Sequence, residues 1–194
     1  MRCVPAACLA VNTLAYATSE PDTERHKIWT LGVSSMIIRE FDEHSDLDRV
    51  RDCLIELQDS ERMFDPRMPS GADIVDKYIP QMLERCKECQ GIILVAEVDG
   101  DVAGYATVFA KVRSEELEDG GIEFGLVSDL VVTKDFRGRG LGRQLLEAAE
   151  SYARASDVNW LRIGMLAGNQ SARNLYTSMG FSNLYVELEK DLTG

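Results

Sequence analysis

A glycine-rich stretch between an apolar strand and an amphipathic helix constrains the fold of this chain more than any other feature. Residues 135–146 read DFRGRGLGRQLL, and glycine occupies every second position from 138 to 142. An apolar run at 124–132 comes before it, and apolar residues at helical spacing follow from 141 to 152. A helix start exposes unpaired backbone N–H groups at the positive end of the helix dipole, and glycine lets a ligand approach the backbone. The order of strand, glycine loop and helix therefore predicts an anion site suited to a diphosphate.

Other interpretations of this glycine loop, residues 137–143, fit the sequence less well. A Walker-type phosphate loop ends in Gly-Lys followed by Ser or Thr, whereas this loop ends in Gly142, Arg143 and Gln144. A dinucleotide fingerprint needs GxGxxG, and the spacing here is GxGxG. An RNA-binding Arg-Gly segment would be disordered and basic, but the chain carries a net charge of −12. An ordinary turn remains the alternative, although three glycines would then be an unnecessary entropic cost.

The composition is that of a globular protein with a core, because 45% of the residues are hydrophobic and 28% are charged. The acidic balance argues against a nucleic-acid partner, which favours a basic surface. The sequence contains no run of 18 apolar residues, so it predicts no membrane span and no membrane partner. We therefore expect a cytoplasmic protein.

Five cysteines occur at irregular spacing, which does not indicate a disulfide framework. Cys86 and Cys89 form a CxxC pair, which fits a redox pair or half of a zinc site. Zinc would need two further ligands, and the only histidines, His26 and His44, form no ligand pair. We expect no metal, and we interpret the pair as two cysteines near the end of a helix.

The N-terminal residues differ in character from the rest of the chain. Residues 1–17 resemble a weak signal peptide that Pro5 and Asn12 interrupt, and residues 18–29 are polar. A new start, MIIRE, appears at Met36. We interpret residues 1–35 as an extension, either flexible or the product of a misassigned start codon, with export as the minority alternative. Residues 36–194 are predicted to form a single domain.

Apolar periodicity and turn residues divide this domain into ten elements. Asp99-Gly100 predicts a hairpin, Ser45 and Ser70 are expected to begin the first two helices, and Gly180 is expected to end the last. The order is β-α-α-β-β-β-α-β-α-β, an α/β fold with a mixed sheet and a late β-α-β crossover. The expected strands cover residues 36–40, 91–98, 101–112, 124–132, 159–166 and 184–192, and the expected helices follow residues 45, 70, 140 and 170.

Two motifs together resemble the GCN5-related N-acetyltransferase (GNAT) superfamily. RGRGLG at 137–142 matches its (Q/R)xxGx(G/A) signature, and NQSARNLYTSMGF at 169–181 resembles its NxxAxxLYxxxGF element. Residues 143–168, which separate the motifs, also fit the family's spacing. By topology the resemblance covers residues 36–194, and it implies a GNAT-type mixed, mostly antiparallel sheet flanked by helices.

The resemblance implies acetyl-coenzyme A (acetyl-CoA) as the co-substrate. Its pyrophosphate would bind the backbone N–H groups of the glycine loop, and its pantetheine arm would pair with the strand before the loop, an edge that can accept an added strand. A backbone N–H near that strand's end would stabilise the oxyanion. The implied cofactor-binding residues are Leu130, Val131, Val132, Arg137, Gly138, Arg139, Gly140, Leu141, Gly142, Arg143, Asn169 and Tyr176. For Asn169 a helix N-cap is the alternative.

The resemblance also implies catalytic residues. Tyr176 matches the tyrosine that in many relatives protonates the departing thiolate, and packing in the core is its alternative. The strand SDLVV resembles one in which a glutamate precedes the aspartate, but Ser128 occupies the place of that glutamate. Asp129 and Glu123 remain candidates for the base that takes the proton of the amine, either directly or through a water molecule. The alternative is that the enzyme has no dedicated base and water carries the proton.

The implied reaction is acetyl transfer to a primary amine, on a small molecule or a peptide, by direct attack in a ternary complex. A non-catalytic acyl-CoA-binding sensor or scaffold is the alternative, and a homodimer is expected only by analogy. An acidic mouth would attract a cationic acceptor. Its residues are Glu61, Asp65, Glu115, Glu116 and Glu118.

Overall fold

The protein is described by a computed structural model over residues 35–114 and 117–192. Within these residues one sheet contains five strands in the order β1-β2-β3-β4-β5. The strands are β1 (Met36–Glu40), β2 (Gly91–Val98), β3 (Asp101–Arg113), β4 (Glu123–Val132) and β5 (Leu161–Ile163). The helices are α1 (Glu43–Glu61), α2 (Gly71–Glu88), α3 (Leu141–Ala155) and α4 (Gln170–Ser178), with short 3₁₀ turns η1 (Leu117–Asp119) and η2 (Lys134–Phe136). The predicted extension lies outside the described residues except for Ser35.

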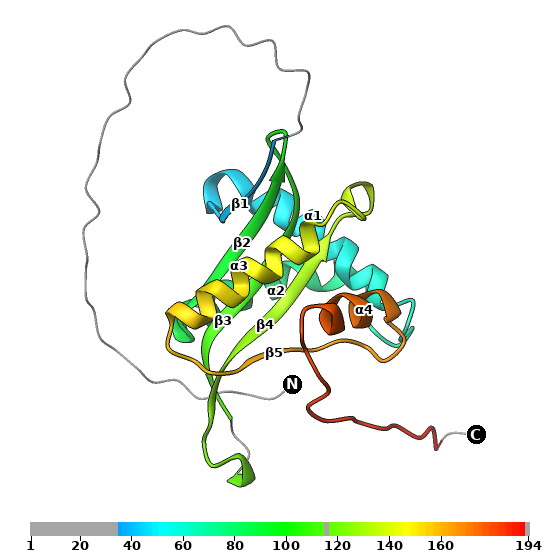
Figure 1. The fold of residues 1–194 in the computed structure, drawn as a ribbon. Coiled ribbons are helices and arrows are strands. Elements are labelled where there is room, and N and C mark those ends of the chain that lie inside the picture. The colour runs from blue at the N-terminus through cyan, green and yellow to red at the C-terminus, as the bar shows by residue number, and fades with distance from the viewer. Residues whose placement is uncertain (1–34, 115–116, 193–194) are drawn as a thin grey trace, which may run out of the picture.

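Helices cover both faces of the sheet, as Figure 1 shows. On one face α1 and α2 bury Val50, Leu54 and Ile79 against the strands. On the other face α3 buries Leu141 and Leu145 in a second apolar cluster. The mixed α/β class that the periodicity predicts is therefore confirmed.

The sheet is antiparallel from β1 to β4 and parallel only between β4 and β5. Helix α3 connects these last two strands, which confirms the predicted β-α-β crossover. The parallel pairing joins Gly125–Val127 to β5 and ends there, because β5 is only three residues long. The strand predicted over residues 159–166 is therefore shorter than expected. Beyond Val127, β4 pairs with β3 alone among the described strands, so its other edge is open.

A β-bulge lies in β4 at Ser128. Thr107 of β3 pairs with Asp129, and the next pair joins Val108 to Val127, which leaves Ser128 as the extra residue. The bulge changes which face the following side chains occupy. Val127 packs in the cluster under α3, whereas Asp129 lies beside Tyr78 of α2. Simple alternation would have kept 127 and 129 on one face.

The helix ends agree with the sequence in part. Ser70 and Asp73 form the predicted capping box at α2, and Gly180 follows α4 with φ of 89°, as a C-cap glycine does. The predicted start of α1 at Ser45 is wrong. The N-cap is Asp42, whose side chain accepts a hydrogen bond from the His44 N–H, because β1 ends at residue 40 and the helix begins almost at once.

The strand predicted at 184–192 is wrong in the described structure. Residues 181–192 have no regular secondary structure, and Leu184, Val186 and Leu188 are at least 65% exposed. Alternating apolar residues form a strand only where a neighbour satisfies the backbone groups. The three-residue β5 offers a short edge for such pairing.

Candidate active site

The glycine loop is open to a ligand. Gly138 and Gly140 have φ of 77° and 84°, a region that other residues rarely adopt. A Cβ atom added at either position would meet nothing within 4 Å. Gly140 is the N-cap of α3 and has no side-chain cap, so the first N–H groups of that helix remain available to an anion.

The arginines of the loop bond to the protein itself. Arg137 donates to the Val132 carbonyl and to Glu56, both at 2.8 Å. Arg139 donates to the Asp135 carbonyl at 3.0 Å, and Arg143 lies on the first turn of α3. These bonds hold the loop's shape and leave the backbone as the main candidate for phosphate binding.

Helix α4 lies against the first turn of α3. A Cβ atom at Gly142 would be 3.3 Å from Leu175 Cδ2, and Arg143 donates to the Ser178 hydroxyl at 2.7 Å. Asn169 caps α4, because its Oδ1 accepts from the Ala172 N–H at 3.0 Å. The cap predicted as an alternative for Asn169 is therefore present, and the NH₂ group of its side chain is what remains for a ligand.

Tyr176 lies on α4 and is partly buried against the α3 cluster. Its ring is tilted by 56° against Phe181, with the ring centroids 6.0 Å apart. Burial, and to a smaller degree the charge of Glu61, raises the pKa of the Tyr176 phenol to about 12. The phenol therefore holds its proton at neutral pH, as a group that donates a proton must.

Asp129 is the centre of a buried polar cluster between the sheet and α2. The Tyr78 hydroxyl donates to its Oδ1 at 2.5 Å. Burial raises the pKa of Asp129, and the bond from Tyr78 opposes the shift. Its Oδ2 and the hydroxyl of Tyr105 are buried without a hydrogen-bond partner in the described structure. Thr107, whose hydroxyl donates to Met82 Sδ at 3.1 Å, also lies near.

Glu123 is separated from these residues. It is the exposed first residue of β4 and pairs with Arg113. Six residues of strand separate it from Asp129, which corresponds to about 20 Å. Asp129 lies three residues before the end of β4, toward the glycine loop, and Tyr176 lies on α4, which contacts the first turn of α3. The structure leaves Glu123 at the far end of the strand.

Glu61, the last residue of α1, is a neighbour of the site that the motifs do not identify. Burial first and the charge of Asp129 second raise the pKa of its carboxyl group. In the sequence its one signal is membership of the acidic mouth. The other described residues of the acidic mouth are not gathered around Glu61 by any bond. Asp65 accepts a hydrogen bond from Arg67, and Glu118 lies in η1. Residues 115 and 116 lie outside the described residues.

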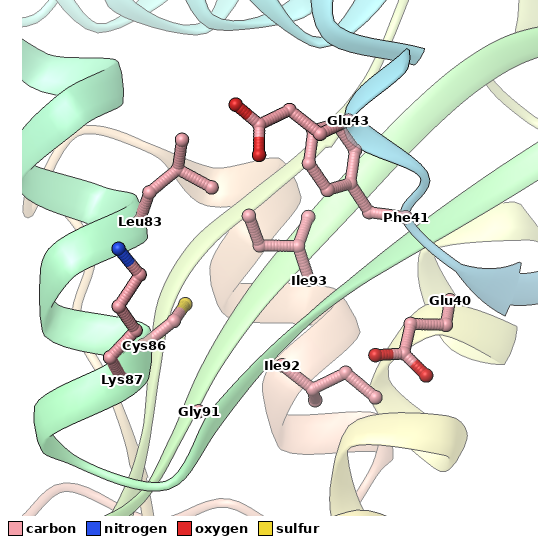
Figure 2. A pocket seen from close by; sticks show the side chains of 9 residues that line it. All are labelled: Glu40, Phe41, Glu43, Leu83, Cys86, Lys87, Gly91, Ile92 and Ile93. Carbon is pink, nitrogen blue, oxygen red and sulfur yellow. The ribbon is translucent and has the colours of Figure 1, made fainter. Parts of the chain in front are cut away.

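A separate cavity of about 280 Å³ lies on the α2 side of β1 and β2. Figure 2 shows the apolar side chains of Phe41, Leu83 and Ile93 around it, together with charged side chains of Glu43 and Lys87. It contains none of the predicted site residues. The cavity is therefore distinct from the glycine loop and from Tyr176.

The CxxC pair lies where a structural pair would. Cys86 is in the last turn of α2, and Cys89 is the buried C-cap residue. Both are free thiols, and burial raises the pKa of Cys86 to about 11, so thiolate chemistry is disfavoured at neutral pH. Over residues 35–114 and 117–192 no cluster of three or more His, Cys, Asp or Glu side chains could hold a metal.

No helix in the same ranges is both long and apolar enough to cross a membrane.

Two solved structures with a similar fold carry the name of acetyltransferases. The aminoglycoside N-acetyltransferase AAC(6')-Iy in complex with CoA superposes with a TM-score of 0.63 at 16% identity, covering 85% of this chain and 99% of that one. A GCN5-related N-acetyltransferase from Ralstonia eutropha JMP134 gives a TM-score of 0.61 at 20% identity, covering 82% of this chain and 100% of the other. Identities this low show the fold alone.

Sequence comparison adds the family. An uncharacterized N-acetyltransferase of Lactobacillus delbrueckii subsp. lactis is 36% identical over 87 residues, 44% of this chain and 49% of that protein. The L-amino acid N-acyltransferase MnaT of Escherichia coli (strain K12) is 34% identical over 89 residues, 46% and 49% of the two chains. The chain spans about half the length of the curated relatives it matches. The acetyltransferase (GNAT) family pattern matches residues 55–181, and this chain belongs to that family.

Proposed function

We propose that the protein transfers an acetyl group from acetyl-CoA to a primary amine, by direct attack of the amine in a ternary complex. The observation that carries this proposal is the contact between α4 and the first turn of α3 at Gly142 and Leu175. At that contact Leu175, the residue before Tyr176, lies against the first turn of α3, and Val132 at the end of β4 lies close to the same point. MnaT and the streptothricin acetyltransferase of Streptomyces lavendulae carry names of amine-acylating enzymes, which supports the same class of reaction.

The residues present fit acetyl-CoA. The open space at Gly138 and Gly140 and the uncapped start of α3 suit its pyrophosphate. The open edge of β4 at residues 130–132 suits the amide groups of its pantetheine arm, although Arg137 already occupies the Val132 carbonyl. When bound, acetyl-CoA supplies the thioester that the amine attacks.

The chain's own residues would then protonate the departing sulfur and stabilise the negative charge of the transition state. The Tyr176 phenol, protonated at neutral pH, donates its proton to the departing sulfur. A backbone N–H near Val132 stabilises the negative charge that develops on the carbonyl oxygen. The NH₂ group of Asn169 is available to the pantetheine region. Neither step requires an acyl-enzyme.

A CoA-release assay with a panel of amines tests the proposal. We suggest spermidine, kanamycin, L-lysine and L-methionine sulfone as acceptors, so that polyamines, aminoglycosides and amino acids are all represented. We expect Tyr176→Phe to lower kcat by about 100-fold while the Kd of CoA stays the same. Tyr185→Phe is the matched control, because Tyr185 is 76% exposed in the C-terminal segment.

Two results would contradict this assignment. Wild-type protein that binds CoA but releases none with any of these amines would support the non-catalytic acyl-CoA-binding alternative. Equal turnover by wild type and Tyr176→Phe would instead leave acetyl transfer intact and remove Tyr176 from the proton step.

A further inference from the structure

The carboxylate of Glu61 lacks a partner, unlike its neighbours at the end of α1. It is partly buried and makes no hydrogen bond or ion pair to any described residue. Asp59 accepts from the Gly71 N–H at 2.9 Å, and Arg62 donates to the Met68 carbonyl at 2.9 Å. Asp65 binds Arg67. A carboxylate removed from water without a counter-ion costs free energy unless a ligand supplies the opposite charge.

The fold places this carboxylate at the proposed site. Phe64, three residues after Glu61, packs on the loop before α4, since a Cβ atom at Gly168 would lie 2.9 Å from its ring. Figure 1 shows the connection between α1 and α2 close to α4. From this position Glu61 acts electrostatically on Tyr176 of α4 and on Tyr105 of β3. The end of α1 therefore faces the helix that carries the proposed proton donor.

The side chains around Asp129 include two buried polar atoms without partners, and one cation, Arg85, acts on Asp129. Asp129 has its Oδ2 unpaired, and the Tyr105 hydroxyl is also unpaired. The positive charge that acts on Asp129 is Arg85, whose guanidinium lies 4.6 Å from the centre of the Phe109 ring. Among the described residues no guanidinium or ammonium group forms an ion pair with Glu61. A cationic ligand would balance this surplus of negative charge.

We propose that Glu61 binds the ammonium group of the acceptor amine and takes its proton. This inference rests on the proposed acetyl transfer and identifies the acceptor as a primary alkylamine that arrives positively charged. It makes Glu61 a catalytic residue, because its carboxylate touches the reacting nitrogen. Asp129, held by Tyr78 behind it, is then a positioning residue that acts through Glu61.

The proton steps balance with the groups already named. One proton passes from the ammonium nitrogen to the Glu61 carboxylate and later to solvent. The free amine then forms the N–C bond as the C–S bond breaks, and the departing sulfur takes a proton from Tyr176. The second proton of the nitrogen restores the phenol. Overall one alkylammonium ion and one acetyl-CoA give one amide, one CoA thiol and one proton.

The surroundings of Glu61 suit this role. Its charge interacts with Asp129 of β4, Tyr105 of β3 and Tyr176 of α4. Burial and the negative charge of Asp129 raise the pKa of the Glu61 carboxyl group. A base whose pKa lies closer to the working pH accepts a proton from an ammonium ion more readily than an ordinary carboxylate does.

The test compares Glu61→Gln with Glu84→Gln, which makes the same chemical change on α2 at an exposed carboxylate. The acceptor is the fastest amine of the four above. We expect Glu61→Gln to lower kcat/KM about 100-fold and to weaken amine binding to the CoA-loaded protein about tenfold. The Kd of CoA should stay the same, the unfolding temperature should not fall because the substitution removes an unpaired carboxylate, and Glu84→Gln should behave as wild type in every measurement.

The pH profile separates the roles of the two carboxylates. In wild type, kcat/KM should fall below the raised pKa of Glu61. Burial is the larger cause of this raised pKa and the charge of Asp129 the smaller one, so Asp129→Asn should move the acid limb part of the way to lower pH. Wild-type kcat/KM and an unchanged acid limb in Glu61→Gln would overturn the inference while leaving acetyl transfer standing. An inactive wild-type protein would instead remove the proposed function itself.

Discussion

At the scale of single residues, the three glycines of the loop differ in what they provide. Gly138 and Gly140 supply positive φ and open space, whereas Gly142 supplies close contact with Leu175. The sequence presents all three as equal members of one alternating motif. Their separate roles depend on the backbone conformation of the loop and on the position of α4. The spacing of the glycines in the sequence reveals neither the conformation nor that position.

A substitution at Gly140 should damage CoA binding more than the loss of an arginine. Gly140→Val forces a β-branched residue to φ of 84°, which distorts the loop or costs about 1–3 kcal/mol. We expect the Kd of CoA, measured by calorimetry, to rise about tenfold or more. Arg139→Ala should change it by less than about threefold, because that side chain bonds to the Asp135 carbonyl and lies over Phe136.

Gly100→Val is the matched control for backbone strain. Gly100 has φ of 92° and open space around it, but it lies in the turn between β2 and β3, away from the loop. The control should lose stability and keep its affinity for CoA. A larger loss of affinity in Arg139→Ala than in Gly140→Val would show that side chains, and not the backbone, hold the phosphates.

At the scale of elements, a partly buried ion-pair network joins β1 to α1 and β2. Arg39 of β1 donates two bonds to Asp46 of α1, at 2.6 and 2.9 Å, and one to Glu97 of β2 at 2.7 Å. The Asp46 side chain is 3% exposed and that of Arg39 is 31% exposed. The bond from Arg39 lowers the pKa of Asp46 to about 2.

Arg39→Met should therefore destabilise the domain by about 1–3 kcal/mol, the range for a hydrogen bond to a charged group. The substitution leaves the buried Asp46 without its cation. Chemical denaturation at pH 7 measures the change. Arg49→Met is the control, because the exposed pair of Arg49 and Asp52 should contribute less than about 0.5 kcal/mol.

The difference between wild type and Arg39→Met should depend on pH. The folded pKa of Asp46 is lowered from 3.8 to about 2, so the unfolded state binds its proton first as the pH falls. The stability from this pair is fully present above pH 3.8 and is lost as the pH approaches 2. Denaturation at pH 7 and at acid pH should show the two proteins converging. A constant difference would mean that Asp46 does not titrate as the pairing requires.

Elements whose signal is local could be predicted from the sequence, and elements that depend on distant partners could not. Asp99-Gly100 forms the expected hairpin, and Ser70 forms the expected capping box. The bulge at Ser128 has no local signal, because it depends on the register between β3 and β4. The α1 cap at Asp42 follows from where β1 ends, which apolar spacing does not reveal.

At the scale of the whole molecule, the site is assembled from parts far apart in the sequence. The glycine loop and Tyr176 carry motifs and could be found without a structure. Glu61, which we propose as the base, lies more than 70 residues before the loop, and the contact between Phe64 and Gly168 joins the end of α1 to the loop before α4. Glu123 is close to Asp129 in sequence but lies at the other end of β4, which shows that nearness in sequence does not identify the partners of a carboxylate in a sheet.

The C-terminal segment gives a test of the fold as a whole. Residues 181–192 form no strand, and the ion pair that Glu189 of this segment makes with Arg67 lies at the surface, with both side chains at least 65% exposed. A chain ending at Ser182 should therefore keep the fold, with an unfolding temperature within about 2–4 °C of the full chain. It should also associate less in sedimentation experiments, because Leu184, Val186 and Leu188 expose apolar surface. Global unfolding on truncation would show instead that these residues form a further strand of the sheet, as their alternation predicts. The edge of β5 would then be paired and not exposed.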